Sequence, residues 1–264
     1  RHKMYSEYKA TRKKMPEELA SQIPILKELL SAMGYKLVSC EGYEADDVLG
    51  TFAKYCEQKN YDCVLATGDK DSLQLISKKV TVRIAATKFG KAEPVFYDES
   101  KVEEEYGVSP HALIDIKALQ GDSSDNIPGV KGIGEKTAKE LIQKFDSIDY
   151  VYNNLDNLDI KENVKNKLKE DRDIAKLSYE LGTVNRDVPI TINDEDYIPA
   201  KMDVPKVKKI MTELEFYSFM DKMVFENDSE PKAEIIAEFL QDSEIKDFFD
   251  KIKNEKSVNF LADI

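Results

Sequence analysis

Apolar residues recur at helical spacing near the start of the chain. The positions, three or four residues apart, are Leu19, Ile23, Leu26, Leu30 and Met33. Pro16 stands where a first helical turn tolerates proline, and Gly34 follows the last apolar position as a stop signal. The pattern therefore predicts an amphipathic helix over residues 16–34.

The next segments alternate between strand-like and helical patterns. Residues 36–40, 62–67 and 80–86 are short apolar runs typical of strands. A helix is expected from about Glu44, with Val48, Phe52 and Cys56 on one face, and a short helix over residues 71–76. Such alternation predicts an α/β fold with a mainly parallel twisted sheet flanked by helices.

After about residue 108 the pattern becomes helical. Helices are predicted over 111–120 and 135–145, with a glycine-rich loop between them, and further helical stretches run to residue 179 and over 206–223. A polar, proline-containing segment follows. The predicted organisation is an α/β core over 1–108, a helical subdomain over 109–225, a linker over 226–232 and the start of another domain over 233–264.

Composition narrows the possible classes. No segment has the apolar length of a membrane span, and the three cysteines form no C-x-x-C pair, so a reducing cytoplasm is the expected location. The formal net charge of −12 argues against a nucleic-acid partner. However, residues 1–15 form a basic segment in which Tyr5 and Tyr8 are interleaved with cations. The cations are Arg1, Lys3, Lys9, Arg12, Lys13 and Lys14.

Acidic side chains gather at three places along the chain. They are Glu44, Asp46 and Asp47 at a predicted helix start, Asp69 and Asp71 after the second strand, and Asp122 and Asp125 after a helix. Each group alone is usually a helix cap or a solvated turn. The carboxyl ends of strands in an open α/β sheet are where ligand sites form, so convergence of these groups is the alternative.

Converging carboxylates would repel one another and raise each other's pKa. Hard divalent cations relieve that repulsion, and an all-oxygen ligand set favours Mg²⁺ or Mn²⁺ over zinc. Two such ions about 3.5 to 4 Å apart would activate a water and stabilise a leaving oxygen in phosphodiester hydrolysis. An acidic chain and a nucleic-acid substrate are therefore compatible.

The loop within residues 121–137, GDSSDNIPGVKGIGEKT, raises two alternatives. A phosphate-binding loop of nucleotide enzymes needs a lysine directly after its last glycine, but Glu135 separates Gly134 from Lys136. The second alternative is a helix–hairpin–helix, in which Gly129, Gly132 and Gly134 let backbone amides approach a phosphate. This arrangement grips a duplex without reading its sequence, and a plain tight turn would need fewer glycines.

Several motifs together resemble a known family. They are RHKMYSEYK at 1–9, GYEADD at 42–47, TGDKD at 67–71, GDSSDN at 121–126 and GVKGIGEKTA at 129–138. In this order they resemble the 5′-nuclease domain of bacterial DNA polymerase I, in the flap endonuclease superfamily. The resemblance covers about residues 1–223, and residues 233–264 resemble the start of the 3′–5′ exonuclease-like domain that follows in that polymerase.

The resemblance implies a PIN-like 5′-nuclease core, a helix–hairpin–helix DNA clamp, and a 5′→3′ exonuclease and flap endonuclease activity that removes RNA primers and 5′ flaps. It implies metal ligation by Glu44, Asp46, Asp47, Asp69, Asp71, Asp122 and Asp125, with K⁺ at the hairpin. It also implies DNA contacts from Arg1, Tyr5, Tyr8, Lys9, Arg12, Gly129, Lys131, Gly132, Gly134, Lys136 and Thr137, with a tyrosine of the basic segment available for stacking on a base.

The family's partners follow from the same resemblance. They are DNA with a 5′ flap, nick or RNA primer and the covalently linked polymerase domains, with no membrane, in a monomer of the bacterial cytoplasm near the nucleoid. The family's first strand and its acids precede the motif at which this chain begins. We therefore expect a sheet that lacks central strands and a chain that cleaves poorly or not at all.

Two competing functions remain. A non-catalytic DNA-binding module would use the acids only as helix caps, and it would bind DNA without cleaving it. An ATP-driven enzyme would bind nucleotide through Lys136. Loss of cleavage with retained DNA binding on replacing Asp46 or Asp122 would distinguish the nuclease from both.

Overall fold

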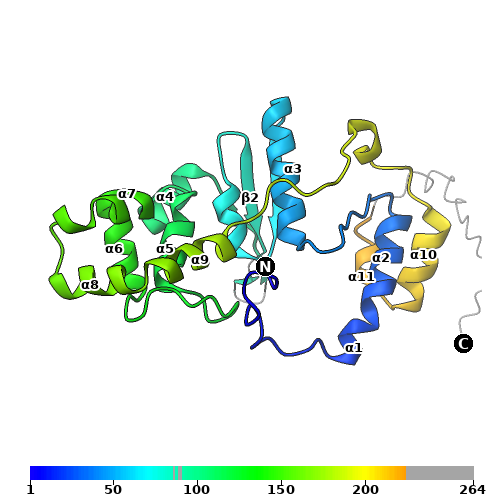
Figure 1. Ribbon diagram of the computed structural model, residues 1–264. Coiled ribbons are helices and arrows are strands. Elements are labelled where there is room, and N and C mark those ends of the chain that lie inside the picture. Colours follow the sequence, from blue (N-terminus) through cyan, green and yellow to red (C-terminus); the bar gives the residue numbers. More distant parts are fainter. Residues whose placement is uncertain (86, 89–90, 224–264) are drawn as a thin grey trace, which may run out of the picture. The chain divides into compact units, whose positions relative to one another are not determined.

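The computed structural model describes residues 1–85, 87–88 and 91–223 (Figure 1). The chain divides into two compact units, Arg1–Asp203 and Val204–Ile264. The predicted linker 226–232 and the segment 233–264 lie outside the described residues. In the second unit, α10 (Val204–Glu213) packs with α11 (Tyr217–Met220), in the stretch predicted to be helical.

A small sheet lies at the centre of the α/β part. β1 (Cys63–Thr67) pairs parallel with β2 (Val80–Ile84), and β2 pairs antiparallel with β5 (Val95–Tyr97). β3 (Thr87–Lys88) and β4 (Lys91–Ala92) form a separate antiparallel pair. The α/β core is confirmed, but the three-stranded sheet of the described residues is mixed, not mainly parallel.

Apolar residues of the strands and of two helices form the first hydrophobic core. α3 (Ala45–Lys59) contributes Ala53, and α4 (Glu99–Tyr106) contributes Val102, both fully buried. The other members include Leu65, Leu73, Val80, Val82 and Ile84. The 3₁₀ helix η1 (Lys70–Leu75) connects β1 to β2 and packs against both strands. This packing holds Asp69 and Asp71 directly after the end of β1.

The helical part surrounds α5 (Ala112–Gln120), which packs against α6 (Glu135–Phe145) and α9 (Arg172–Gly182). The remaining elements of this part are α7 (Ile148–Asn153), η2 (Leu155–Asn157) and α8 (Glu162–Glu170). Leu119, Ile142 and Leu168 are among the fully buried side chains of this second core. The two predicted helices on either side of the glycine-rich loop are confirmed.

The N-terminal helix differs from its prediction. Instead of one helix over 16–34, α1 (Glu17–Ala20) and α2 (Gln22–Ala32) are separated at Ser21. Gly34 is the predicted stop: its φ is +89°, and a Cβ there would lie 2.1 Å from the carbonyl oxygen of Ala200. The Ala200 N–H donates to the Gly34 carbonyl, 3.0 Å away, in the segment that contains η3 (Asp194–Tyr197).

The predicted strand over 36–40 is wrong, because these residues are described and form no strand. An apolar run becomes a strand only where a neighbouring strand accepts and donates its backbone hydrogen bonds. Leu37 is exposed here, and none of the three strands of the described sheet pairs with this segment.

A buried carboxyl group in α5 makes folding stability depend on pH. Asp115 is 4% exposed, and burial, followed by the nearby charge of Asp149, raises its pKa to about 7 although the Ile148 N–H donates to it. The unfolded chain releases this proton near 3.8. The folded protein therefore loses stability progressively as the pH rises from about 4 to about 7.

We expect Asp115→Asn to remove this penalty, because an amide stays neutral and can still accept the Ile148 N–H bond. At pH 8 the variant should exceed the wild type by roughly 2–4 kcal/mol in free energy of unfolding, and the difference should vanish near pH 4. Urea denaturation at several pH values measures it. A constant difference across that range would contradict the assignment.

Candidate metal and nucleic-acid site

Three carboxylates from two separate parts of the chain converge. Asp71, Asp122 and Asp125 each offer an oxygen within 4.8 Å of the others. Asp71 lies in η1, and the other two lie in the turn after α5, where Asp122 and Ile127 exchange backbone hydrogen bonds of 2.9 and 2.8 Å. This bridge closes the turn and fixes Asp125, which is 6% exposed. The predicted convergence of the second and third acidic groups is therefore present.

The first acidic group lies next to these three. Tyr8 donates from its hydroxyl to Asp125, 3.3 Å away, and lies 3.4 Å from Glu44. The pKa of Asp46 is raised by its burial and then by the neighbouring charges of Asp69, Asp71 and Glu44. Mutual repulsion of this kind is what a bound cation relieves. Six of the seven predicted carboxylates thus share one region.

Asp47 differs from the other six. Arg1 donates two hydrogen bonds to its carboxylate at 2.8 and 2.9 Å, and the backbone N–H groups of Glu44 and Asn185 donate two more. Burial alone would raise the pKa of Asp47, but these bonds, led by that from Arg1, lower it below its usual value. Its oxygens are occupied in joining the start of α3 to the basic segment and to residue 185.

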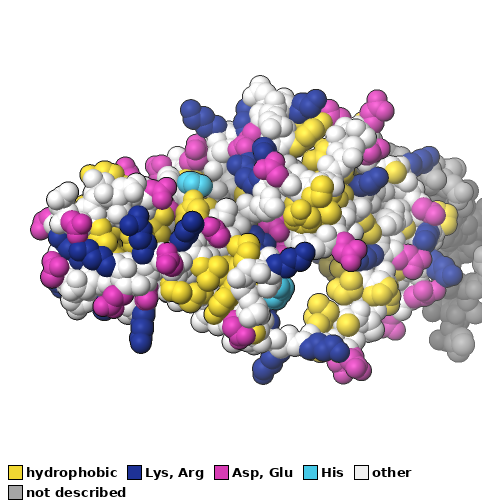
Figure 2. Space-filling view, viewed as in Figure 1, with side chains coloured by type: hydrophobic (Ala, Val, Ile, Leu, Met, Phe, Trp, Pro, Cys, Tyr) yellow, Lys and Arg dark blue, Asp and Glu magenta, His cyan; other side chains and the backbone are white. Residues whose placement is uncertain are grey.

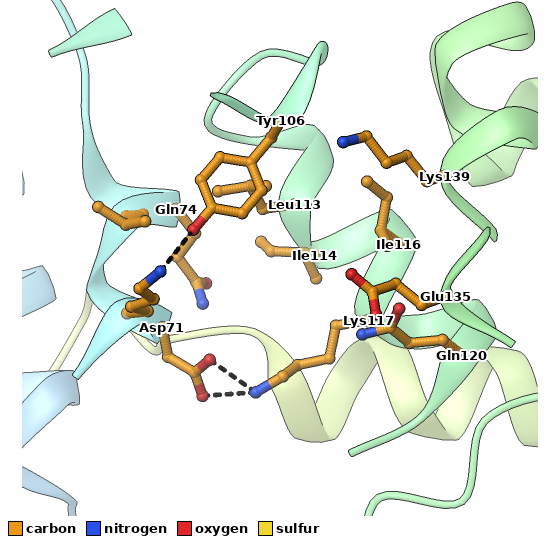
Figure 3. A pocket seen from close by; sticks show the side chains of 12 residues that line it. Asp71, Gln74, Tyr106, Leu113, Ile114, Ile116, Lys117, Gln120, Glu135 and Lys139 are labelled. Carbon is orange, nitrogen blue, oxygen red and sulfur yellow. Dashed lines mark hydrogen bonds and ion pairs between the residues drawn. The ribbon is translucent and has the colours of Figure 1, made fainter. Parts of the chain in front are cut away.

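Lys117 is a site residue that the sequence reasoning missed. Its Nζ lies 2.5 and 2.7 Å from the two oxygens of Asp71 (Figure 3). The same Nζ lies 2.7 Å from Asp122. Burial lowers the pKa of Lys117, yet Asp71 and Asp122 together raise it above the usual value. The one lysine of the helix before GDSSD, which also carries Asp115 and Gln120 among apolar residues, was the available signal.

The two carboxylates that pair with Lys117, Asp71 and Asp122, differ in the direction of their pKa shifts. Burial raises the pKa of Asp71 above its usual value in spite of Lys117. Burial acts in the same direction on Asp122, but hydrogen bonds from Lys117 and Ser124 outweigh it and lower the pKa to about 2. Asp122 is therefore held ionised. Beside Lys117 a cavity of about 200 Å³ extends towards Tyr106, Leu113 and Lys139 (Figure 3).

The basic segment packs onto the acids. The Lys9 ammonium lies 2.6 Å from Glu44 and 3.8 Å from Asp125, and Arg12 forms an ion pair with Asp125. Tyr8 is 2% exposed and packs with Ile127 and Leu181, so its ring is not free to stack on a base as expected; Tyr5 packs against the same cluster and is partly exposed. On the face seen in Figure 2, Lys and Arg side chains lie among Asp and Glu and form no continuous basic stripe.

Some backbone N–H groups of the hairpin donate to side chains elsewhere in the chain, and others remain free. Gly129 is buried with φ +64°, and its N–H donates to Ser178 Oγ. The Lys131 N–H donates to Asp171. Among the described residues, the N–H groups of Gly132 and Gly134 have no acceptor, and the side chain of Lys136 is 90% exposed. The expectation that the Gly129 amide faces a phosphate is therefore wrong.

The donor set fits a hard divalent cation. The converging atoms are all carboxylate oxygens, which Mg²⁺ and Mn²⁺ prefer. Cys40, Cys56 and Cys63 are free thiols, and none belongs to this cluster. Lys117 and Lys9 at present neutralise the carboxylates that such an ion would contact.

No helix in the described part of the chain is long and apolar enough to cross a membrane.

Two family models match adjacent parts of the chain. The model described as 5′-3′ exonuclease, N-terminal resolvase-like domain, matches residues 1–107. The model described as 5′-3′ exonuclease, C-terminal SAM fold, matches residues 108–205. Together they include all seven acidic residues and the hairpin. The predicted order, an α/β core followed by a helical subdomain, is confirmed.

Curated relatives carry the name DNA polymerase I. The protein of Caldicellulosiruptor bescii is 42% identical over 83% of this chain and 26% of its own length. That of Bacillus subtilis is 38% identical over 99% of this chain and 28% of its own length. The chain thus spans about a quarter of the length of these relatives.

Solved structures of similar fold include nucleases. One, described as divalent metal ions (zinc) bound to T5 5′-exonuclease, has a TM-score of 0.58 and 21% identity, covering 80% of this chain and 78% of that chain. A bacteriophage T5 flap endonuclease in complex with DNA and metal ions has a TM-score of 0.56 and 21% identity, covering 81% and 79%. At this identity the likeness shows the fold alone.

Proposed function

We propose, since the chain belongs to the 5′-3′ exonuclease family, that it is the metal-dependent 5′ nuclease part of a DNA polymerase I and hydrolyses phosphodiester bonds in DNA. One observation carries the proposal. Asp71, Asp122 and Asp125 bring oxygens from two separate parts of the chain within 4.8 Å of one another. A structural role as helix caps or turns requires no such convergence.

Asp71, Asp122 and Asp125 would hold the cations, with Glu44, Asp46 and Asp69 beside them as direct or water-mediated ligands. Bound Mg²⁺ or Mn²⁺ ions, two or more, would activate the attacking water and stabilise charge on the leaving oxygen. We assign Asp47 a structural role, because four hydrogen bonds occupy its oxygens.

The basic side chains around the site would also contact phosphates of the DNA. Lys9, Arg12 and Lys117 neutralise the carboxylates in this structure. Once those carboxylates bind metal, each of these side chains becomes available to a phosphate of the bound strand. The long, flexible stem of lysine lets its ammonium group move from a carboxylate to a phosphate of the bound strand.

The hairpin would hold the duplex. The free N–H groups of Gly132 and Gly134, the start of α6 and the exposed Lys131 and Lys136 can contact phosphates, and Thr137 lies in the same first turn. We include K⁺ at this hairpin in the proposal. Tyr5 is the tyrosine of the basic segment that we retain as a DNA contact. The Arg1 guanidinium donates to Asp47 and to the carbonyl oxygens of Leu181 and Thr183, so we assign Arg1, like Asp47, a structural role.

The finer assignments complete the proposal. The substrates are 5′ flaps, nicks and RNA primers in DNA. The α/β core ends at about residue 108, the helical subdomain follows it, and polymerase domains belong to the same polypeptide. We place the protein, as a monomer, in the bacterial cytoplasm near the nucleoid.

The test is cleavage of a labelled 5′-flap DNA with Mg²⁺ and with a chelator, by this chain and by a longer version with flanking sequence. Because the chain spans about a quarter of its relatives' length, the longer version tests the function in its natural context. Cleavage that requires Mg²⁺ supports the nuclease. Duplex binding without cleavage by either version favours the non-catalytic binding module.

A further inference from the structure

Three side chains from outside the hairpin hold its backbone. The Gly129 N–H donates to Ser178 Oγ at 3.0 Å, and the Lys131 N–H donates to Asp171 Oδ2 at 2.7 Å. Lys167 Nζ donates to the Gly132 carbonyl oxygen at 2.9 Å. Lys167 lies on α8 and Ser178 on α9, with Asp171 between these helices. Three groups within four residues of one loop are thus bound from one corner of the helical part.

The side chain of Asp171 binds the hairpin and not the helix that follows it. Asp171 is the N-cap residue of α9, where aspartate normally accepts a hydrogen bond from the first helical turn. Its side chain forms no such cap here and binds the Lys131 N–H instead. Its φ of −105° and ψ of 25° lie outside the extended region of a capping aspartate, so the side chain is directed to the hairpin and not to the first turn of α9.

The position of Lys167 depends on a glycine in the hairpin. Gly132 has φ +76°, and a Cβ at this residue would lie 2.8 Å from Lys167 Nζ and 3.1 Å from its Cε. The absent side chain lets the ammonium group reach the Gly132 carbonyl. A fixed positive charge therefore lies against a hairpin residue whose own N–H is free.

We propose that Lys167 and Asp171 are positioning residues for duplex binding, which fix the hairpin in the conformation that presents the N–H groups of Gly132 and Gly134 to phosphate. This inference rests on the proposed function. A loop held in its bound conformation loses less entropy on binding than a loop that must first become ordered. Asp171 acts through the backbone, since its negative charge would itself repel DNA.

Charge and positioning predict opposite results for Asp171→Ala, which makes the test sharp. Removing an acid beside a DNA-binding loop should tighten binding if charge alone matters. We expect instead that Kd for a short duplex rises about tenfold, measured by fluorescence anisotropy on the full chain. Asp171→Asn keeps an oxygen acceptor for the Lys131 N–H and should restore most of the affinity.

Asp173→Ala is the matched control, since it removes the same charge from an exposed position two residues further along the chain. It should bind duplex as well as the wild type or slightly better. Lys167→Met provides a second variant and should also weaken binding. In DNA-free protein, amide hydrogen exchange of Lys131 should accelerate in Asp171→Ala and remain unchanged in Asp173→Ala, at equal global stability.

The outcomes separate the inference from the proposed function. If the wild type binds duplex while Asp171→Ala binds equally well or better, or exchanges at the wild-type rate, the positioning role is overturned and the nuclease proposal stands. If Asp171→Asn fails to restore affinity, the hydrogen bond is not the cause and the inference is likewise overturned. A wild type that binds no duplex overturns both.

Discussion

Asp122→Asn, in the longer version with flanking sequence, is expected to lower the rate of metal-dependent cleavage by about 100-fold or more, with duplex binding retained. Asp122 is the carboxylate that its surroundings keep ionised, with a pKa of about 2 set against burial by Lys117 and Ser124. The amide removes one negative charge from the three-carboxylate cluster. It also leaves Lys117 paired with Asp71 alone, which strengthens competition between the ammonium group and a cation.

Mn²⁺ binding to the chain, followed by calorimetry, provides a readout that does not depend on turnover. Affinity should fall in Asp122→Asn and remain unchanged in Asp159→Asn, whose carboxylate is fully exposed and lies 3.6 Å from Lys144. Cleavage is then compared at saturating DNA. Equal Mn²⁺ affinity in Asp122→Asn and the wild type would remove Asp122 from the metal site.

Gly129→Ala is expected to destabilise the protein by about 3 kcal/mol or more. Gly129 has φ +64°, and a Cβ would lie 2.3 Å from the backbone nitrogen of Gly121 and 2.6 Å from the carbonyl carbon of Gln120. These are backbone atoms at the end of α5, so relief of the clash would move the turn that carries Asp122. Urea denaturation measures the loss.

Gly134→Ala is the control within the same hairpin. Gly134 has φ −96°, and no atom lies within 4 Å of a Cβ placed there. The same substitution should therefore cost no more than about 1 kcal/mol, the difference between glycine and alanine at a helix N-cap. Similar losses for the two variants would show that the backbone contact at Gly129 does not decide the effect.

Helices with strong local signals could be predicted from the sequence. The range 135–145 coincides with α6, because Gly134 before it and the spacing of Ala138, Leu141 and Ile142 define its start and its buried face. The range 36–40 failed since a strand depends on a partner elsewhere in the chain. The same distinction applies within the site. Acidic residues close together in sequence indicated the site. The residues that contact them from other parts of the chain could not be predicted.

The sequence by itself determined the classes of residue that meet: the acidic groups, the glycine hairpin and the basic segment, each encoded within a short run of consecutive positions. Only the tertiary structure decided their pairing. It placed Lys117 between Asp71 and Asp122, paired Asp47 with Arg1, and buried Tyr8. The physical reason is that ion pairs and burial act over a few ångströms in space between residues far apart in sequence. Their partners are therefore set by the packing of the helices and strands, which no local pattern specifies.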